Sequence, residues 1–176
     1  MHFSKYLLAL VCLPAFSVGV TPIPNVGGRP LTTGLFTIIS STDPSRRLDL
    51  NKALGNDNNP VTAFKPDSVV SVNQQWSFIA TGAANTFQIQ NGISTPVFLS
   101  SPNASTVRFA QAVVHSNPTA LVISAFSPGS PFFNILFNGL ALTYWPAPSS
   151  SFSSPLTFEF PGGALNSFQN WTLIPV

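Results

Sequence analysis

A threefold repeat constrains the fold of this chain more than any other feature of its sequence. Each repeat begins with phenylalanine, one spacer residue and isoleucine, at residues 36–38, 87–89 and 133–135. The three segments start 51 and 46 residues apart. Repeats of this length are supersecondary units that bury their apolar faces only against one another. The sequence therefore predicts one domain assembled from three similar parts.

Short apolar segments continue each repeat after its Phe-x-Ile start. The second set lies at residues 48–50, 97–99 and 140–142, and the third lies at 61–64, 107–109 and 156–158. Proline, glycine, asparagine and serine separate these segments, and no window keeps a helical period for a dozen residues. Three repeats of about four strands each predict an all-β fold. That number of strands fits a β-trefoil, in which a six-stranded barrel is closed at one end by three hairpins and leaves no exposed sheet edge.

Two of the repeats close with the same Gln-x-Trp motif. The motif is Gln74-Gln75-Trp76 in the first repeat and Gln169-Asn170-Trp171 in the third. Each tryptophan follows the proline of a Pro-x-Thr segment by 16 residues, so the two repeats align there without a gap. The second repeat lacks the motif, and its residues 119–121, Thr-Ala-Leu, are predicted to take the equivalent place.

The Gln-x-Trp motif resembles that of the ricin B-type lectins and of related β-trefoil carbohydrate-binding modules. The resemblance covers the three repeats and is strongest in the first. It implies that Trp76 and Trp171 fill the barrel core, while Gln74 and Gln169 tie backbone groups at the strand ends. The disulfides that are usual in that family have no counterpart here, because the single cysteine, Cys12, precedes the repeats.

The resemblance also implies one intact sugar-binding site, in the first repeat. Asp49 falls where the family carries an acidic residue that accepts hydrogen bonds from two sugar hydroxyls, and Phe64 falls at the aromatic platform. Asn73 and Gln74 fall at the polar pair before the tryptophan, and Thr62 stands where a glutamine is often found. In such a site a few placed polar groups orient the sugar, while the aromatic ring contacts its apolar face.

The predicted orientation of Asp49 follows from its neighbours in the sequence. Leu48 and Leu50 are expected to point inward, so the alternation of side chains along a strand turns Asp49 outward. The alternative is that Asp49 only caps a turn and that the ring of Phe64 belongs to the core. Asn51 and residues 57–59 are expected to line the rim of the site.

The second and third repeats lack the same set of side chains. Alignment by apolar triplets places Phe98 and Ala141 at the position of the acid. In the third repeat Phe168 replaces the asparagine, and Glu159 replaces the aromatic platform. Neither repeat is therefore expected to bind a sugar by the chemistry of the first. The aromatic pair at residues 144–145 is expected to serve packing rather than ligand contact.

The chain is expected to enter the secretory pathway. Residues 1–19 have a charged start, an apolar stretch too short to span a bilayer and small residues near their end, as in a signal peptide. Residues 20–33, rich in proline and glycine, form a leader, and residues 34–176 form the β-trefoil domain. Asn103, in an Asn-Ala-Ser sequon, is the expected glycosylation site. These features are compatible with a secreted fungal glycoprotein.

Charge is too scarce to indicate a nucleic-acid or anionic-membrane partner. The chain has 7 lysine and arginine residues and 5 acids, and only Arg46 and Arg47 are adjacent. A surface of serine, threonine, asparagine and glutamine suits neutral, hydroxyl-rich ligands. We therefore expect the partners to be glycans, and the resemblance to the ricin B-type lectins implies glycans of the galactose or N-acetylgalactosamine type, or a cell-wall polysaccharide. No nucleic acid, membrane insertion, metal or cofactor is expected.

Enzyme chemistry has few candidate residues after the signal peptide. His115 is the one histidine there, and no nucleophile-elbow motif lies near it to suggest a hydrolase triad. Glycoside hydrolysis, in turn, needs two carboxyl groups about 5–10 Å apart. We therefore expect a binding protein rather than an enzyme. The alternative is a β-trefoil protease inhibitor or another protein-binding trefoil that presents the loops around residues 102–105 and 146–155 to its partner.

Overall fold

The structure is a computed structural model that describes residues 25–26, 29–30, 34–66, 69–102, 107–127, 129–148 and 150–176. Strands dominate these residues, which confirms the predicted all-β class. A short hairpin pairs β1 (Asn25–Val26) with β2 (Arg29–Pro30), and the other strands form one 13-stranded sheet. The predicted signal peptide, residues 1–19, and the sequon residue Asn103 lie outside the described residues. None of the helices in the described part of the chain is long and apolar enough to cross a membrane.

Six strands close into a barrel. They are β3 (Leu35–Ser40), β6 (Trp76–Ala80), β7 (Thr86–Asn91), β11 (Leu121–Ala125), β12 (Phe133–Phe137) and β15 (Trp171–Pro175). Each strand pairs antiparallel with the next in this order, and β15 returns to pair with β3. The ring therefore leaves none of these barrel strands at a sheet edge.

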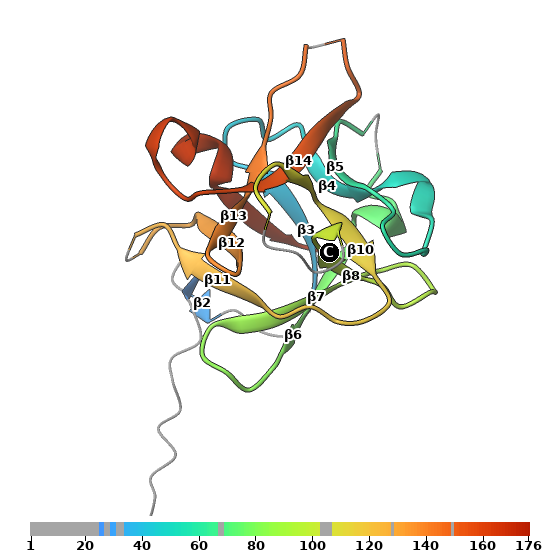
Figure 1. The fold of residues 1–176 in the computed structure, drawn as a ribbon, viewed down its shortest axis with the longest axis horizontal. Helices are drawn as coiled ribbons and strands as arrows, with labels where there is room; N and C mark the ends of the chain where they lie inside the picture. Colours follow the sequence, from blue (N-terminus) through green and yellow to red (C-terminus); the bar gives the residue numbers. More distant parts are fainter. Residues whose placement is uncertain are drawn as a thin grey trace, which may run out of the picture.

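Three hairpins cap the barrel. They consist of β4 (Arg47–Leu50) with β5 (Val61–Phe64), β8 (Phe98–Ser100) with β10 (Val113–His115), and β13 (Leu140–Tyr144) with β14 (Ser153–Glu159). In Figure 1, β4, β5 and β14 lie side by side in the upper part of the molecule, where β14 also pairs with β5. The short β9 (Ala110–Gln111) pairs with β14 as well. The 3-10 helices η1 (Asn51–Ala53), η2 (Val72–Gln74) and η4 (Gly163–Gln169) lie in the connections.

Strand register confirms the predicted threefold repeat. The first phenylalanine of each repeat pairs with the residue that opens the closing strand of the same repeat. These pairs are Phe36 with Trp76, Phe87 with Leu121, and Phe133 with Trp171. Leu121 therefore stands where the other repeats have tryptophan, as the sequence predicts for residues 119–121.

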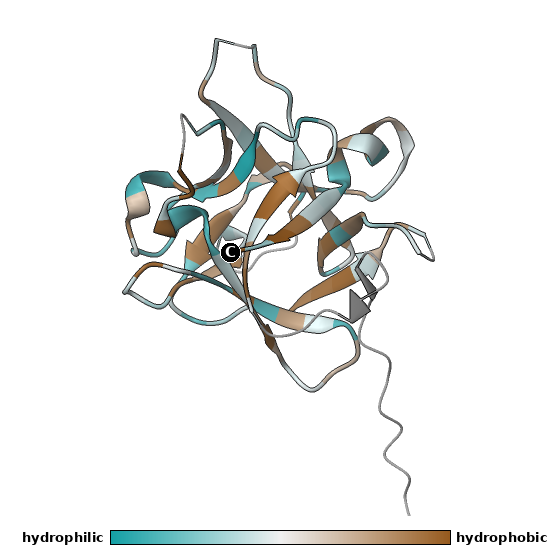
Figure 2. Ribbon diagram, turned by 180° about the vertical axis from the view of Figure 1, so that it is seen from behind, coloured by the Kyte–Doolittle hydropathy of each residue, from teal (hydrophilic) through white to brown (hydrophobic). Residues whose placement is uncertain are grey.

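The closing tryptophans connect the barrel to its cap. Trp76 and Trp171 are fully buried, and their indole N–H groups donate to the main-chain oxygens of Leu48 at 3.1 Å and Leu142 at 3.0 Å. Figure 2 shows apolar residues concentrated on the strands and hydrophilic residues mainly in the connections. Both tryptophans therefore lie in the core, as the resemblance implies, whereas Gln74 donates to the side chain of Asp49 rather than to a main-chain group.

The third strand of the second repeat differs from the prediction. The sequence places it at residues 107–109, whereas strands form at Ala110–Gln111 and Val113–His115. Phe109 has a φ of 60°, in the left-handed region that is incompatible with a regular strand, and its side chain is 62% exposed. Hydropathy alone does not distinguish this exposed turn residue from a strand residue.

We expect Trp171→Ala to lower the free energy of unfolding by about 3–5 kcal/mol, because it removes a buried aromatic side chain and leaves a cavity. The hydrogen bond to Leu142 is lost as well. Urea unfolding followed by circular dichroism measures the change. Trp145→Ala is the control, because Trp145 is only partly buried. Equal losses in the two variants would contradict the structural role of the closing motif.

Candidate functional site

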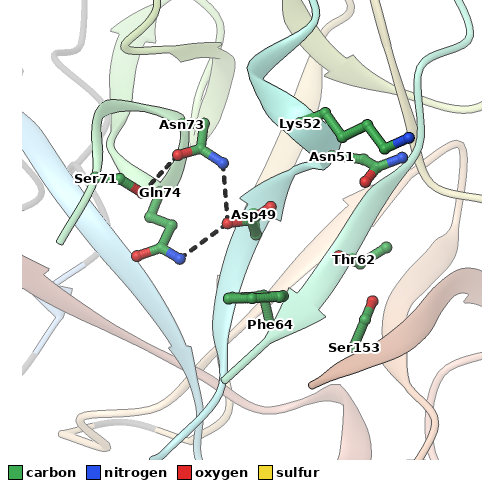
Figure 3. Close-up of a pocket in the computed structure, with 9 residues that line it drawn as sticks. All are labelled: Asp49, Asn51, Lys52, Thr62, Phe64, Ser71, Asn73, Gln74 and Ser153. Atoms are coloured by element: carbon green, nitrogen blue, oxygen red, sulfur yellow. Dashed lines mark hydrogen bonds between the residues drawn. The ribbon is translucent and has the colours of Figure 1, made fainter. Parts of the chain in front are cut away.

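A pocket of about 350 Å³ opens beside the first-repeat hairpin. Its volume lies within the usual range for small-molecule sites, about 300–1,000 Å³. The lining comes from the hairpin, from the segments around η1 and η2, and from the start of β14. It consists of Asp49, Asn51, Lys52, Thr62, Phe64, Ser71, Asn73, Gln74 and Ser153 (Figure 3). All five residues predicted to form the sugar site lie in this lining.

Pairing of β4 with β5 brings three of these residues together. Asp49 lies directly opposite Thr62. Phe64 follows Thr62 by two residues on β5, so both side chains stand on the same face of the hairpin. In Figure 3 the ring of Phe64 lies across the pocket below Asp49. Phe64 is partly exposed and outside the buried core cluster, which argues against the interpretation of this ring as a core residue.

Two side-chain amides hold the carboxylate of Asp49. Asn73 Nδ2 donates to Oδ2 at 3.0 Å, and Gln74 Nε2 donates to the same oxygen at 2.9 Å. Asn73 also donates to the main-chain oxygen of Leu50 at 3.0 Å, which fixes its own orientation. No group in the described part of the chain donates to the other carboxylate oxygen, Oδ1. That oxygen is therefore available as an acceptor.

Asp49 turns away from the two core leucines into the pocket, as alternation predicts, but it is buried there rather than exposed to solvent. Its exposed fraction is only 6%. Alternation predicts exposure only where one face of a strand meets water, and here the segment that carries Asn73 and Gln74 covers that face. Burial raises the pKa of the Asp49 carboxyl above its ordinary value, and the two amide hydrogen bonds offset only part of this effect.

A strained loop forms part of the pocket rim. Lys52 and Ala53 have φ values of 54° and 53°, a left-handed conformation that costs on the order of 1–3 kcal/mol for a non-glycine residue. The buried side chain of Asn59 holds this loop, because its Nδ2 donates to the main-chain oxygens of Asn51 and Leu54, both at 2.8 Å. The loop therefore keeps its conformation through contacts beneath it.

The composition of the rim differs from the prediction. Asn51 lines the pocket, whereas Asp57 and the two residues after it do not. Asp57 instead accepts a hydrogen bond from the main-chain nitrogen of Ser116 at 2.6 Å. Lys52, Ser71 and Ser153 also line the pocket and are not predicted from the sequence. An alignment of repeats has no signal for Lys52, which a strained loop places, or for Ser153, which another repeat supplies.

Comparison with known proteins identifies the architecture. No protein-family model matches the chain, and no curated protein matches it in sequence. Among solved structures, the designed threefold-symmetric protein ThreeFoil matches with a TM-score of 0.67 at 19% identity, over 81% of this chain and 99% of that one. The fold is a β-trefoil.

Two natural proteins share this trefoil architecture. The Rhizoctonia solani agglutinin matches with a TM-score of 0.67 at 19% identity, over 83% of this chain and 97% of the agglutinin. The ricin B-like lectin of Macrolepiota procera, in complex with lactose, matches with a TM-score of 0.67 at 17% identity, over 83% of this chain and 99% of the lectin. The resemblance to ricin B-type trefoils seen in the sequence is therefore confirmed at the level of the fold.

Hydrogen bonds define the counterpart of Asp49 in the third repeat of the trefoil. Gln74 donates to Asp49, and Gln169 Nε2 donates to Thr143 Oγ1 at 3.1 Å. In both repeats the closing tryptophan donates its indole N–H to the main-chain oxygen of the residue just before that acceptor. This residue is Leu48 in the first repeat and Leu142 in the third. Thr143, not Ala141, therefore stands at the position of the acid.

The second repeat shows the same shift from the predicted alignment. Thr119, at the glutamine position, donates to Ser100 Oγ at 2.8 Å. Ser100 rather than Phe98 is therefore the counterpart of Asp49. The misassignments in the second and third repeats have the same cause. Side chains two residues apart share a face of a strand, so an alignment by apolar triplets hardly changes when it is shifted by two residues. A neutral hydroxyl thus replaces the carboxylate in both of the other repeats.

A buried network fills the platform position of the third repeat. Glu159 is fully buried and accepts hydrogen bonds from the main-chain nitrogen of Phe109 at 3.0 Å and the hydroxyl of Thr157 at 2.6 Å. Trp145 Nε1 donates to that hydroxyl at 2.7 Å, and its ring contacts Phe109. Arg108 Nε lies 3.5 Å from the other oxygen of Glu159. Trp145 therefore serves packing, as the sequence indicates.

We expect Asp49→Asn to be more stable than the wild type at neutral pH. Asparagine keeps an oxygen acceptor for Asn73 and Gln74 but carries no charge for burial to penalise. The pKa of Asp49 is higher in the folded protein than the unfolded value of 3.8. Below pH 3.8 the carboxyl group is protonated in both states and destabilises the fold least. As the pH rises through the folded pKa, the buried group becomes charged and destabilises the wild type increasingly. Chemical unfolding of both proteins from about pH 3 to about pH 7 measures the difference. An advantage of Asp49→Asn that shrinks toward neutral pH would contradict the burial of this charge.

Proposed function

We propose that this β-trefoil is a secreted glycan-binding protein with one sugar site, the pocket of the first repeat. The observation that carries the proposal is the carboxylate of Asp49, which two amides hold by one oxygen while the other stays free, above the ring of Phe64. A charged acceptor beside an aromatic face suits a ligand with both hydroxyl groups and an apolar side. Secretion rests on the signal-peptide pattern of residues 1–19.

Each lining residue has a separate role in the proposed complex. Asp49 Oδ1 accepts hydrogen bonds from sugar hydroxyls, and its charge makes them stronger than neutral ones. Phe64 offers its ring to the C–H face of the sugar. The hydroxyl of Thr62, without a hydrogen-bond partner in the described ranges, supplies a further polar contact. Asn73 and Gln74 direct their amide N–H groups to Asp49, so they position the carboxylate rather than contact the sugar.

Similarity to other trefoils supports a glycan as the ligand. The Macrolepiota procera protein is a ricin B-like lectin seen with lactose, and the Rhizoctonia solani protein is an agglutinin. We infer for this chain a glycan of the galactose or N-acetylgalactosamine type, or a cell-wall polysaccharide. The hydroxyl and amide side chains that make up most of the lining suit such neutral, hydroxyl-rich molecules.

A protein-binding role, such as protease inhibition, is the second candidate. Phe109 and Phe160 are 62% and 60% exposed, and the guanidinium carbon of Arg108 lies 4.8 and 4.7 Å from their ring centroids. Aromatic residues beside an arginine have the composition of protein-interface hot spots. A protease panel separates the two candidates, because inhibition without glycan binding favours this aromatic surface over the pocket.

We infer that the pocket binds without catalysis. Asp49 is the one acid in its lining, whereas glycoside hydrolysis commonly uses a pair. His115 lies 3.7 Å from Asp57, but the hydroxyl of Ser116 donates to Asp57 rather than to the imidazole, so these three do not form a nucleophilic triad. Across the described residues, no three His, Cys, Asp or Glu side chains gather as metal ligands would.

We expect Asp49→Asn to weaken glycan binding by about ten- to a hundredfold, the effect of losing a hydrogen bond to a charged acceptor. Both amide contacts can persist in the variant, so the loss reports the ligand interaction rather than misfolding. A glycan array followed by calorimetric titration of the best ligand measures it. Asp57→Asn is the matched control, because it removes a carboxylate outside the pocket. If Asp49→Asn bound every glycan as tightly as the wild type, the proposed site would be wrong.

We also expect glycan affinity to fall on acidification at a higher pH than an ordinary aspartate would cause. Burial raises the pKa of Asp49 above 3.8, so protonation removes the charged acceptor earlier as the pH decreases. Titrations between about pH 7 and about pH 4, with circular dichroism to verify folding, measure the effect. Constant affinity over this range would contradict a binding role for the Asp49 carboxylate.

A further inference from the structure

One wall of the first-repeat pocket belongs to the third repeat. Ser153, at the start of β14, lies opposite Phe64 on β5 and lines the pocket. Figure 3 places Ser153 beside Phe64, on the side away from Asn73 and Gln74. Two repeats therefore build the site, which an alignment of the repeats does not reveal.

An exposed ring extends the aromatic surface beyond this wall. Phe152 directly precedes Ser153 and is 58% exposed. Its ring centroid lies 6.4 Å from that of Phe64, and the two ring planes are 27° apart, so the rings present nearly parallel faces. The two rings together form apolar surface beside the pocket that a ligand can cover.

A buried arginine fixes the backbone beneath this ring. Arg46 donates from Nη2 to the main-chain oxygen of Ser151 at 2.9 Å and from Nη1 to that of Ala63 at 3.4 Å. The main-chain nitrogen of Lys65 donates to the oxygen of Phe152 at 2.8 Å. The segment that carries Phe152 is thus tied to the first-repeat hairpin before any ligand binds, which lowers the entropic cost of binding there.

We propose that Phe64 and Phe152 form two adjacent subsites, so that the site binds a glycan of at least two sugar units. This inference rests on the proposed sugar site at Asp49. The first unit occupies the pocket, where polar groups fix its orientation. The second unit lies with its C–H face on Phe152. Because this second contact is apolar, it adds affinity without selecting one particular sugar.

The continuity of the two rings identifies the occupant. Phe152 lies next to Phe64, so we expect a glycan chain that leaves the pocket on this side to contact its ring. The added surface is the face of one phenyl ring, which matches one pyranose ring. A stable protein partner needs an interface on the order of 800 Å² on each side, far more than this ring offers. A second sugar of the same ligand is therefore the occupant that the geometry favours.

Affinities for a monosaccharide and for its disaccharide test the second subsite. The probes are galactose and lactose, together with the tightest-binding glycan of an array and its own terminal monosaccharide. We expect the wild type to bind each longer glycan about three- to tenfold more tightly than the monosaccharide, as one aromatic contact provides. Phe152→Ala should remove this difference and leave the affinity for the monosaccharide unchanged.

Two further variants make the outcome decisive. Phe152→Leu keeps apolar bulk beside Phe64 but no ring, and it should also lose most of the preference for the longer glycan. Phe160→Ala, which removes an equally exposed ring at the other end of β14, should change neither affinity. Two outcomes overturn the second subsite without affecting the first. One is equal affinity of the wild type for the monosaccharide and the longer glycan, and the other is equal weakening of both affinities by Phe152→Ala. Absence of any glycan binding by the wild type overturns both proposals.

Discussion

In the first and third repeats, an indole hydrogen bond from the closing tryptophan ties the barrel to its cap. Trp76, on a barrel strand, bonds the main-chain oxygen of Leu48 on the cap hairpin. Gln74 precedes that tryptophan by two residues and reaches Asp49, the residue after Leu48. The bond between barrel and cap therefore lies beside the contact through which the glutamine reaches the carboxylate. A motif that serves packing also builds the pocket proposed to bind sugar.

The same frame carries different chemistry in the three repeats. In the second and third repeats, Ser100 and Thr143 occupy the position of Asp49, and a neutral hydroxyl needs little compensation when it is buried and hydrogen-bonded. The first repeat instead buries the carboxylate of Asp49, and the side-chain amides of Asn73 and Gln74 both donate to one oxygen of this carboxylate. Packing alone gives no reason for that arrangement, since the other repeats pack without it. Ligand binding gives one.

Most of the fold and the core of the site could be predicted because their signals repeat along the chain. Phe-x-Ile starts and Gln-x-Trp ends define three units, and the five predicted sugar-site residues line one pocket. The hairpin register could not be predicted, because a shift of two residues keeps the apolar pattern, so the sequence predicts Phe98 at the position that Ser100 occupies. The burial of Asp49 and the presence of Ser153 depend on contacts with segments remote in sequence. The left-handed backbone at Lys52 has no signature in hydropathy.

The barrel is sealed by its own first and last strands. β15 pairs with β3 over five residues, from Trp171 with Ser40 to Pro175 with Phe36. Contacts between segments so far apart in sequence form slowly, because the entropy of closing the long intervening chain is lost before the contact stabilises it. Until the last strand emerges from the ribosome, the earlier strands cannot complete their core. Closure of the barrel is therefore a late event in folding, since it requires the whole length of chain from β3 to β15.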